Sequence, residues 1–152
     1  MNPQQIKLKL REFNTKGYSD EHAKYISNDK GGKIIKLEDG YLKYEDEYYG
    51  GEPYSGNETI WLNDKPIWRC VYYGFVEENE DFESVYAFSR LALREGPSEK
   101  GVHRGPEIFL KDNLTYQTET QGTIENFVIY EKISRNGMQI YQATFMGGMV
   151  DQ

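Results

Sequence analysis

The chain has 152 residues, of which 28% are charged and 14% aromatic. Its apolar and aromatic residues are numerous enough to form a core, which excludes an intrinsically disordered protein. The formal net charge is −7, and residues 37–152 carry ten Lys/Arg against twenty-one Asp/Glu. This part of the chain repels phosphate groups, so we expect no nucleic-acid partner. No segment approaches the roughly 18 continuous apolar residues of a membrane-spanning helix, so we expect no membrane association.

Residues 1–32 predict a short helix followed by a loop. Asn2 is a good helix N-cap, and Pro3 suits the first helical position. Three apolar residues then recur at helical spacing: Ile6, Leu10 and Phe13. We expect Gly17 to end the helix, because glycine tolerates the backbone conformations found at helix C-termini.

Residues 33–76 predict a first antiparallel meander, because apolar and polar side chains alternate along them. Its strands are expected at residues 33–37, 41–49, 58–62 and 67–75. Turn sequences rich in Gly, Asp, Asn and Pro separate these strands.

Residues 77–96 contain the clearest helix, predicted at about 80–95. Acidic residues crowd its start, where they favour the positive end of the helix dipole, and Gly96-Pro97 ends it. The remaining residues, 97–152, predict a loop and a second meander. Together these elements predict a single α+β domain over residues 1–152, built mainly from an antiparallel sheet of about six to eight strands.

The two meanders are similar in sequence. Glu58-Thr59-Ile60 and Ile67-Trp68 align with Glu131-Lys132-Ile133 and Ile140-Tyr141. The same register aligns two large-small-large sets, namely Trp68, Cys70 and Tyr72 with Tyr141, Ala143 and Phe145. Side chains alternate along a strand, so each set shares one face, and we expect these faces to form the common core. The opposite face could pack the helix at 80–95 or line a ligand cleft.

The cysteine and histidine content bounds the chemistry. Cys70 is the only cysteine, so no internal disulfide can form, and we expect it to be a small core residue of a cytoplasmic protein. The N-terminus lacks the apolar stretch of a signal peptide. His22 and His103 are the only histidines, and no His, Cys, Asp or Glu cluster has zinc-ligand spacing. We therefore expect neither a metal site nor a cofactor.

Several motifs within residues 33–150 are similar to those of a known family. They are Tyr48–Glu58, Lys65–Trp68, Tyr72–Gly74, Arg104–Pro106 and Phe145–Gly148. This pattern resembles a small bacterial domain of unknown function that often follows an XRE-type helix-turn-helix and also occurs alone. The preceding segment here is too short for a helix-turn-helix, so the resemblance implies the stand-alone version. It supports the fold and the compartment, and it implies no activity.

The glycine-rich segment GGEPYSG lies beside several tyrosines, an arrangement that lets a flat ligand approach the backbone and stack on the rings. Arg104 suits a phosphate or carboxylate group, because its guanidinium is planar. The expected ligand-binding residues are Tyr49, Glu52, Tyr54, Glu58, Arg69, Tyr73 and Arg104. Glu131 stands at the repeat position equivalent to Glu58, which favours a structural role for Glu58, and we assign no catalytic residue.

These observations favour a non-enzymatic module of a bacterium or phage. It would bind a small molecule, nucleotide-like or anionic, or a protein partner. One alternative is a small hydrolase or isomerase that uses Glu52, Glu58 or His103. Another is an acidic inhibitor or counter-defence protein that acts on a basic partner. The sequence does not predict the oligomeric state.

Overall fold

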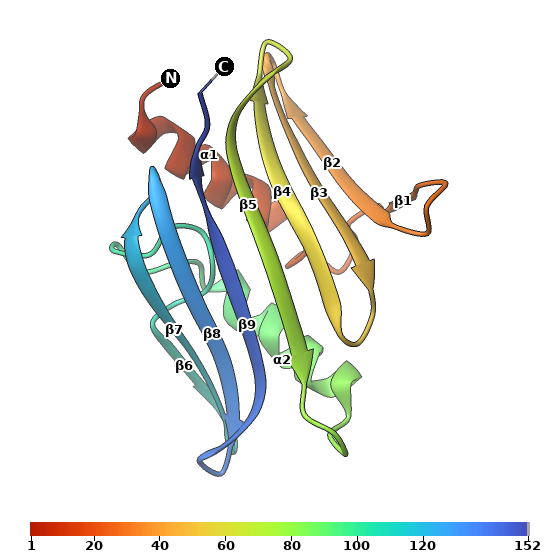
Figure 1. Ribbon diagram of the computed structural model, residues 1–152. Coiled ribbons are helices and arrows are strands. Elements are labelled where there is room, and N and C mark those ends of the chain that lie inside the picture. The colour runs from red at the N-terminus through yellow and green to blue at the C-terminus, as the bar shows by residue number, and fades with distance from the viewer. Residues whose placement is uncertain (152) are drawn as a thin grey trace.

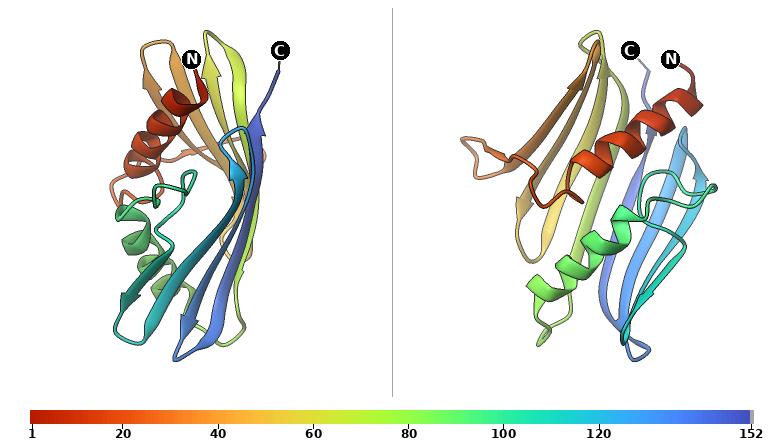
Figure 2. Two further views of the ribbon diagram at one scale, coloured as in Figure 1. Left: turned by 90° about the vertical axis from the view of Figure 1, so that its left-hand side faces the viewer. Right: turned by 180° about the vertical axis from the view of Figure 1, so that it is seen from behind.

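The computed structural model describes residues 1–151, which form one antiparallel sheet with both helices on the same face (Figures 1 and 2). The strand order is β1-β2-β3-β4-β5-β9-β8-β7-β6. The elements are α1 (Pro3–Lys16), β1 (Ile26–Ser27), β2 (Lys33–Asp39), β3 (Leu42–Gly50), β4 (Tyr54–Leu62), β5 (Lys65–Val76), α2 (Phe82–Arg94), β6 (Ile108–Lys111), β7 (Leu114–Thr123), β8 (Asn126–Arg135) and β9 (Met138–Met149).

The predicted α+β antiparallel fold is confirmed, but the strand count is wrong. The described residues form nine strands rather than six to eight. The difference comes from β1 and β6, two short strands at the opposite edges of the sheet. Each is too short to show a clear alternation of apolar and polar side chains.

The sheet consists of two meanders joined at its centre. Strands β2 to β5 pair in sequence order, as do β6 to β9, and the halves meet where β5 pairs with β9. This junction places Tyr72 opposite Phe145. A helix precedes each meander, so the likeness of the halves in sequence corresponds to an approximate two-fold relation in space (Figure 2).

Helix α1 begins and ends where the sequence predicts. The side chain of Asn2 accepts a hydrogen bond from the backbone N–H of Gln5, and the Gln5 side chain accepts one from Asn2, which completes a capping box. Gly17 is the C-cap. The buried stripe is Ile6, Leu10 and Phe13. The Phe13 ring stacks on Tyr44 of β3 at a centroid distance of 5.4 Å, which fixes α1 on the first meander.

Helix α2 connects the halves and lies within the predicted range. Asp81 is its N-cap, with a side chain that accepts a hydrogen bond from the Glu83 backbone N–H. Its inner face buries Val85, Phe88 and Ala92. The segment that follows α2 runs back between the helices and the sheet, and residues 101–105 are all buried.

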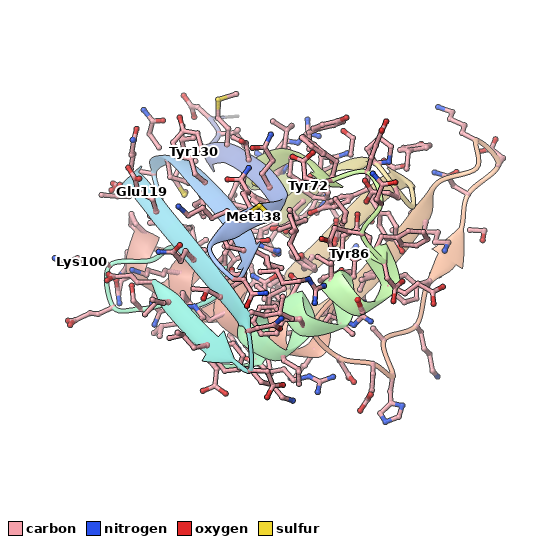
Figure 3. The ribbon with its side chains drawn as sticks, turned by 90° about the horizontal axis from the view of Figure 1, so that it is seen from below. Tyr72, Tyr86, Lys100, Glu119, Tyr130 and Met138 are labelled. Carbon is pink, nitrogen blue, oxygen red and sulfur yellow. The ribbon has the colours of Figure 1, made fainter. Side chains whose placement is uncertain are left out.

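The two faces of the sheet differ in their cover. The covered face buries both large-small-large sets, Trp68, Cys70 and Tyr72 with Tyr141, Ala143 and Phe145, as predicted. Helix α2 packs on this side, where Tyr86 contacts Tyr141, so the suggestion that the opposite face packs this helix is wrong. The opposite face is open and exposes Val71, Tyr73 and Tyr130, of which Tyr130 is labelled in Figure 3. Within residues 1–151, neither helix has the length and apolar character needed to cross a membrane.

Candidate functional site

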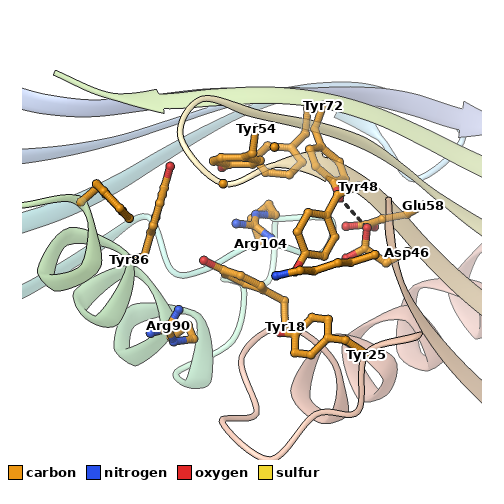
Figure 4. Close-up of a pocket in the computed structure, with 15 residues that line it drawn as sticks. Tyr18, Tyr25, Asp46, Tyr48, Tyr54, Glu58, Tyr72, Tyr86, Arg90 and Arg104 are labelled. Carbon is orange, nitrogen blue, oxygen red and sulfur yellow. Dashed lines mark hydrogen bonds between the residues drawn. The ribbon is translucent and has the colours of Figure 1, made fainter. Parts of the chain in front are cut away.

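A pocket of about 350 Å³ opens on the covered side of the sheet (Figure 4). Its aromatic wall consists of Tyr18, Tyr25, Tyr48, Tyr54, Tyr72, Phe82, Tyr86 and Phe145. Its charged groups are Lys33, Asp46, Glu58, Arg90 and Arg104. The first meander supplies one side, α2 a second, and the segment after α1 a third. Small-ligand sites have volumes in this range and combine aromatic walls with a few polar groups.

Two glycines allow tyrosine rings to lie against the strand backbone at this wall. Tyr72 is paired across the sheet with Gly56, and Tyr54 with Gly74. A Cβ atom at Gly56 would lie 2.4 Å from the Tyr72 hydroxyl, and one at Gly74 would lie 2.5 Å from the Tyr54 hydroxyl. Any larger residue at either position would therefore displace a ring that shapes the pocket.

Asp46 and Glu58 place two carboxyl groups side by side at one end of the pocket. They are Cα partners on β3 and β4, and their exposed fractions are only 5% and 2%. The Tyr72 hydroxyl donates a hydrogen bond of 2.5 Å to Asp46. Burial raises the pKa of Asp46, and the charge of Glu58 raises it further, to about 7, against the opposing effect of the Tyr72 hydrogen bond.

Arg104 lies in the middle of the pocket, but its charge is already paired. Its guanidinium donates two hydrogen bonds to Glu131, of 2.9 and 3.0 Å, and lies 4.1 Å from the centroid of the Phe145 ring. The hydroxyls of Tyr116 and Tyr141 also donate to Glu131. Burial alone would raise the pKa of Glu131, but these partners outweigh it and lower that pKa. The pair is a structural feature of the second meander.

This pair extends to the pocket wall through a chain of hydroxyl groups. The Tyr54 and Tyr141 hydroxyl oxygens are 2.7 Å apart. Because Tyr141 already donates its proton to Glu131, Tyr54 donates to Tyr141. The chain fixes the Tyr54 side chain, so its ring is held in place before any ligand binds.

Two further cations line the pocket nearer to solvent. Arg90 of α2 is half-buried and lies over the Tyr18 ring at 5.8 Å from its centroid. Lys33 at the start of β2 is exposed. The site therefore has carboxyl groups at its buried end and cationic side chains closer to its exterior.

A second polar cluster adjoins the pocket at Glu58. Oε2 of Glu58 lies 3.2 Å from Nε2 of His103, whose exposed fraction is 2%. Glu58, His103 and Cys70 have potential ligand atoms that all lie within 4.8 Å of one another. These three residues are the group within the described chain that could hold a metal ion.

The structure brings together some of the residues expected from the sequence and separates others. Tyr54, Glu58 and Arg104 line the pocket. Tyr49, Arg69 and Tyr73 lie outside it. Tyr73 is exposed on the open face, and Arg69 donates hydrogen bonds to Thr59 and Asn57 there. The hydroxyl of Tyr49 donates to Glu47.

Glu52 also lies outside the pocket and holds α2 in place. Its carboxylate accepts a hydrogen bond of 2.8 Å from the Val76 backbone N–H and another from the Tyr86 hydroxyl. Of the three groups considered for catalysis, Glu58 and His103 are therefore in contact, whereas Glu52 is engaged elsewhere.

Sequence reasoning missed Asp46, Tyr18, Tyr86 and Arg90. A signal for Asp46 was present, because the alternation in YLKYEDEYY places it on the same face as Leu42 and Tyr44, which are buried. An acidic residue on the core face of a strand is uncommon and indicates a functional or paired group. The other three come from helical and loop segments whose approach to the sheet has no local signal.

Comparison with known proteins gives a family but no function. The model of a domain of unknown function, DUF5680, matches residues 46–150. The chain belongs to this family. No curated protein and no solved structure matches it significantly. The DUF5680 match begins within β3 and covers β4 to β9, and it includes Asp46, Glu58 and Glu131.

Proposed function

We propose that this DUF5680 domain is a non-enzymatic module that binds a small, flat molecule with N–H donor groups, such as a nucleobase or a nucleoside. The observation that carries the proposal is the combination of an aromatic wall with two buried carboxyl groups, Asp46 and Glu58, in one pocket. Carboxyl oxygens accept hydrogen bonds from N–H groups, and tyrosine rings stack on flat heterocycles.

The charge distribution favours a particular orientation of the ligand. Arg104 is fully paired with Glu131, so within residues 1–151 the buried end of the pocket offers no unpaired arginine or lysine for a phosphate. Arg90 and Lys33 lie closer to solvent. A nucleotide-like ligand would thus direct its heterocycle toward Asp46 and Glu58 and its anionic group toward Arg90 and Lys33. We therefore assign the anion-binding role expected for Arg104 to Arg90 and Lys33 instead.

The proposal includes the setting expected from the sequence. We infer a cytoplasmic protein of bacterial or phage origin, because its single cysteine is unpaired and its motifs resemble a bacterial domain often joined to XRE-type regulators. A small-molecule sensor domain would suit that association.

The test is a binding screen with adenine, guanine and cytosine, their nucleosides and their 5′-monophosphates. We expect at least one compound to raise the melting temperature of the protein, with a dissociation constant measurable by titration calorimetry. At pH 8, above the Asp46 pKa of about 7, Asp46→Asn should weaken binding about tenfold or more, because the amide offers only one acceptor oxygen and a competing donor where the carboxylate has two acceptors. A charge reversal, Arg90→Glu, should reduce any preference for the monophosphate over the nucleoside.

The matched control is Tyr73→Ala, which removes an aromatic ring from the open face and leaves the pocket intact. It should bind with unchanged affinity. The proposal fails if no compound in the panel shifts the melting temperature, or if Asp46→Asn and Tyr73→Ala behave alike.

A second candidate function is proton transfer on the bound ligand. The observation in its favour is that Glu58 reaches the pocket on one side and contacts His103 at 3.2 Å on the other. Such a pair could move a proton between the ligand and the interior. Incubating a ligand found in the screen with the protein in D₂O would reveal it as exchange of a ligand C–H, seen by NMR and lost in Glu58→Gln. Absence of exchange would leave binding alone.

A further inference from the structure

Glu58, Cys70 and His103 meet in the interior of the first half of the molecule. They come from β4, β5 and the buried loop after α2, and each is at most 2% exposed. Their potential ligand atoms lie within 4.8 Å of one another. Oε2 of Glu58 and Nε2 of His103 lie 3.2 Å apart without hydrogen-bond geometry, and Nδ1 of His103 is buried with no hydrogen-bond partner among the described residues. Buried polar atoms of this kind are rare in native proteins and call for a partner.

The second half of the molecule shows how the equivalent carboxylate is neutralised. Glu131 occupies the repeat position of Glu58 and forms a bidentate ion pair with Arg104, supported by the hydroxyls of Tyr116 and Tyr141. Arg104 directly follows His103 in the chain, so one buried loop supplies a neighbour to each carboxylate. Glu58 receives an imidazole where Glu131 receives a permanent cation. The first half therefore lacks the fixed positive charge that the second half has.

Cys70 also distinguishes the first copy of the repeat from the second. Ala143 stands in the second half at the position of Cys70, and both are buried. A small apolar residue is thus sufficient for packing at this position. In the first half the same place offers a sulfur atom within 4.8 Å of the Glu58 and His103 ligand atoms, with one weak hydrogen bond of 3.6 Å to the Val71 carbonyl.

We propose that Glu58, Cys70 and His103 bind a divalent transition-metal ion of the zinc class. One thiolate, one imidazole and one carboxylate form a donor set that suits Zn²⁺ or Co²⁺ and not Mg²⁺ or Ca²⁺. Tetrahedral zinc holds such ligand atoms about 3.5 Å apart, and the 3.2 Å between Glu58 and His103 already meets that spacing. The ion, a thiolate and a carboxylate together carry no net charge, as a buried site requires.

The surroundings of His103 suit a fixed ligand. Its ring contacts Trp68, Phe127 and Phe145 edge-on, at centroid distances of 5.5, 5.6 and 6.0 Å. These three rings restrict rotation of the imidazole and exclude water from it. Cys70 and His103 do not line the ligand pocket, whereas Glu58 does. The metal site therefore shares one residue, Glu58, with the ligand pocket, whereas Cys70 and His103 belong to the metal site alone.

The experiment titrates Co²⁺, then Zn²⁺, into chelator-treated full-length protein under a phosphine reductant. We expect a thiolate-to-cobalt charge-transfer band in the near ultraviolet that saturates at stoichiometric Co²⁺ and disappears when Zn²⁺ replaces it. Because Cys70 is the only cysteine, such a band can arise from this residue alone. Zn²⁺ should also raise the melting temperature.

Three variants identify the metal ligands, and they are chosen so that the fold is retained. Cys70→Ala should fold, since alanine is the residue at the equivalent position, and it should lose the band completely. His103→Gln should weaken Zn²⁺ binding by at least about 100-fold. His22→Gln is the matched control, because His22 is the other histidine of the chain and is exposed, and it should bind metal like the wild type.

Three results would overturn the proposal. The first is a folded wild type, verified by circular dichroism, that gives no charge-transfer band with Co²⁺ and no thermal shift with Zn²⁺. His103 would then be an ion-pair partner of Glu58 and nothing more. The second is a band that survives in Cys70→Ala. The third is loss of Zn²⁺ binding in His22→Gln with retention in His103→Gln, which would place the ion at the surface.

Discussion

Asp46 illustrates how a single side chain responds to its position in the sheet. It lies on the covered face of β3, buried beside Glu58, with one strong hydrogen bond from Tyr72. Water would stabilise its charged form, but here burial and a neighbouring carboxyl group disfavour that form and raise the pKa to about 7. The folded protein therefore retains a proton that the unfolded chain would release.

This difference predicts that Asp46 makes stability depend on pH. The folded-state pKa of about 7 lies above the ordinary aspartate pKa of 3.8, so the folded state binds more protons between these values and stability falls as the pH rises through this window. Asp46→Asn should remove this dependence and be more stable than the wild type at pH 8 by about 2–4 kcal/mol. Urea unfolding at several pH values between 5 and 8, with a chelator present, measures it.

Glu45→Gln serves as the control for that comparison. Glu45 is the preceding residue, forms an ion pair with Lys36 and is partly exposed, so its replacement should leave the pH profile unchanged. A wild type whose stability is flat or rises from pH 5 to 8 would contradict the assignment of the raised pKa.

At the scale of an element, β5 shows that strand alternation decides the role of each side chain. Trp68 is fully buried, stacks on Phe127 at 5.7 Å and donates a hydrogen bond to the Ile124 carbonyl. Tyr73, on the same strand, faces solvent on the open side. Two large aromatic residues only five positions apart thus have opposite energetic importance.

We predict that Trp68→Ala lowers the free energy of unfolding by about 3–5 kcal/mol, because it leaves a large cavity and an unpaired carbonyl group. Tyr73→Ala should change it by less than about 1 kcal/mol. Denaturant unfolding followed by far-ultraviolet circular dichroism compares the two. Similar losses in both variants would show that the open face is covered in solution.

Sequence patterns predicted these elements well because each long strand and each helix carries its own periodic signal and end signals. Asn2, Gly17 and Gly96 mark helix ends locally, and the repeat aligned Trp68 with Tyr141 correctly. The short strands β1 and β6 carry no such signal. The site was predicted less completely, because contacts such as Arg104 with Glu131 join residues 27 positions apart through a loop whose path depends on the packing of both helices.

At the scale of the whole molecule, the two halves share one interior. Strands β5 and β9 pair over nine residues, Trp68 of the first half bonds to Ile124 of the second, and residues 101–105 lie buried between them. Neither half can expose its core without disrupting the other. The approximate two-fold relation therefore describes the arrangement of the chain, and it does not divide the molecule into separate folding units.

We accordingly predict a single cooperative unfolding transition. Hydrogen exchange of peptides from residues 33–76 reports the first meander, and that of peptides from residues 114–149 reports the second. The urea midpoints from the two sets of peptides should coincide. A gap between them would mean that one meander remains folded while the other opens.

The loop that carries His103 and Arg104 has a consequence for how members of this family diverge. Two consecutive residues of the chain contact different carboxylates, so selection acts on each of them separately. Arg104 is tied to Glu131 and to the hydroxyls around it, whereas His103 is tied to Glu58 and Cys70. Among relatives, a change at His103 should be accompanied by changes at Glu58 or Cys70, and a change at Arg104 by changes at Glu131. Neither change should require the other, so these two residues should covary with their spatial partners and not with each other.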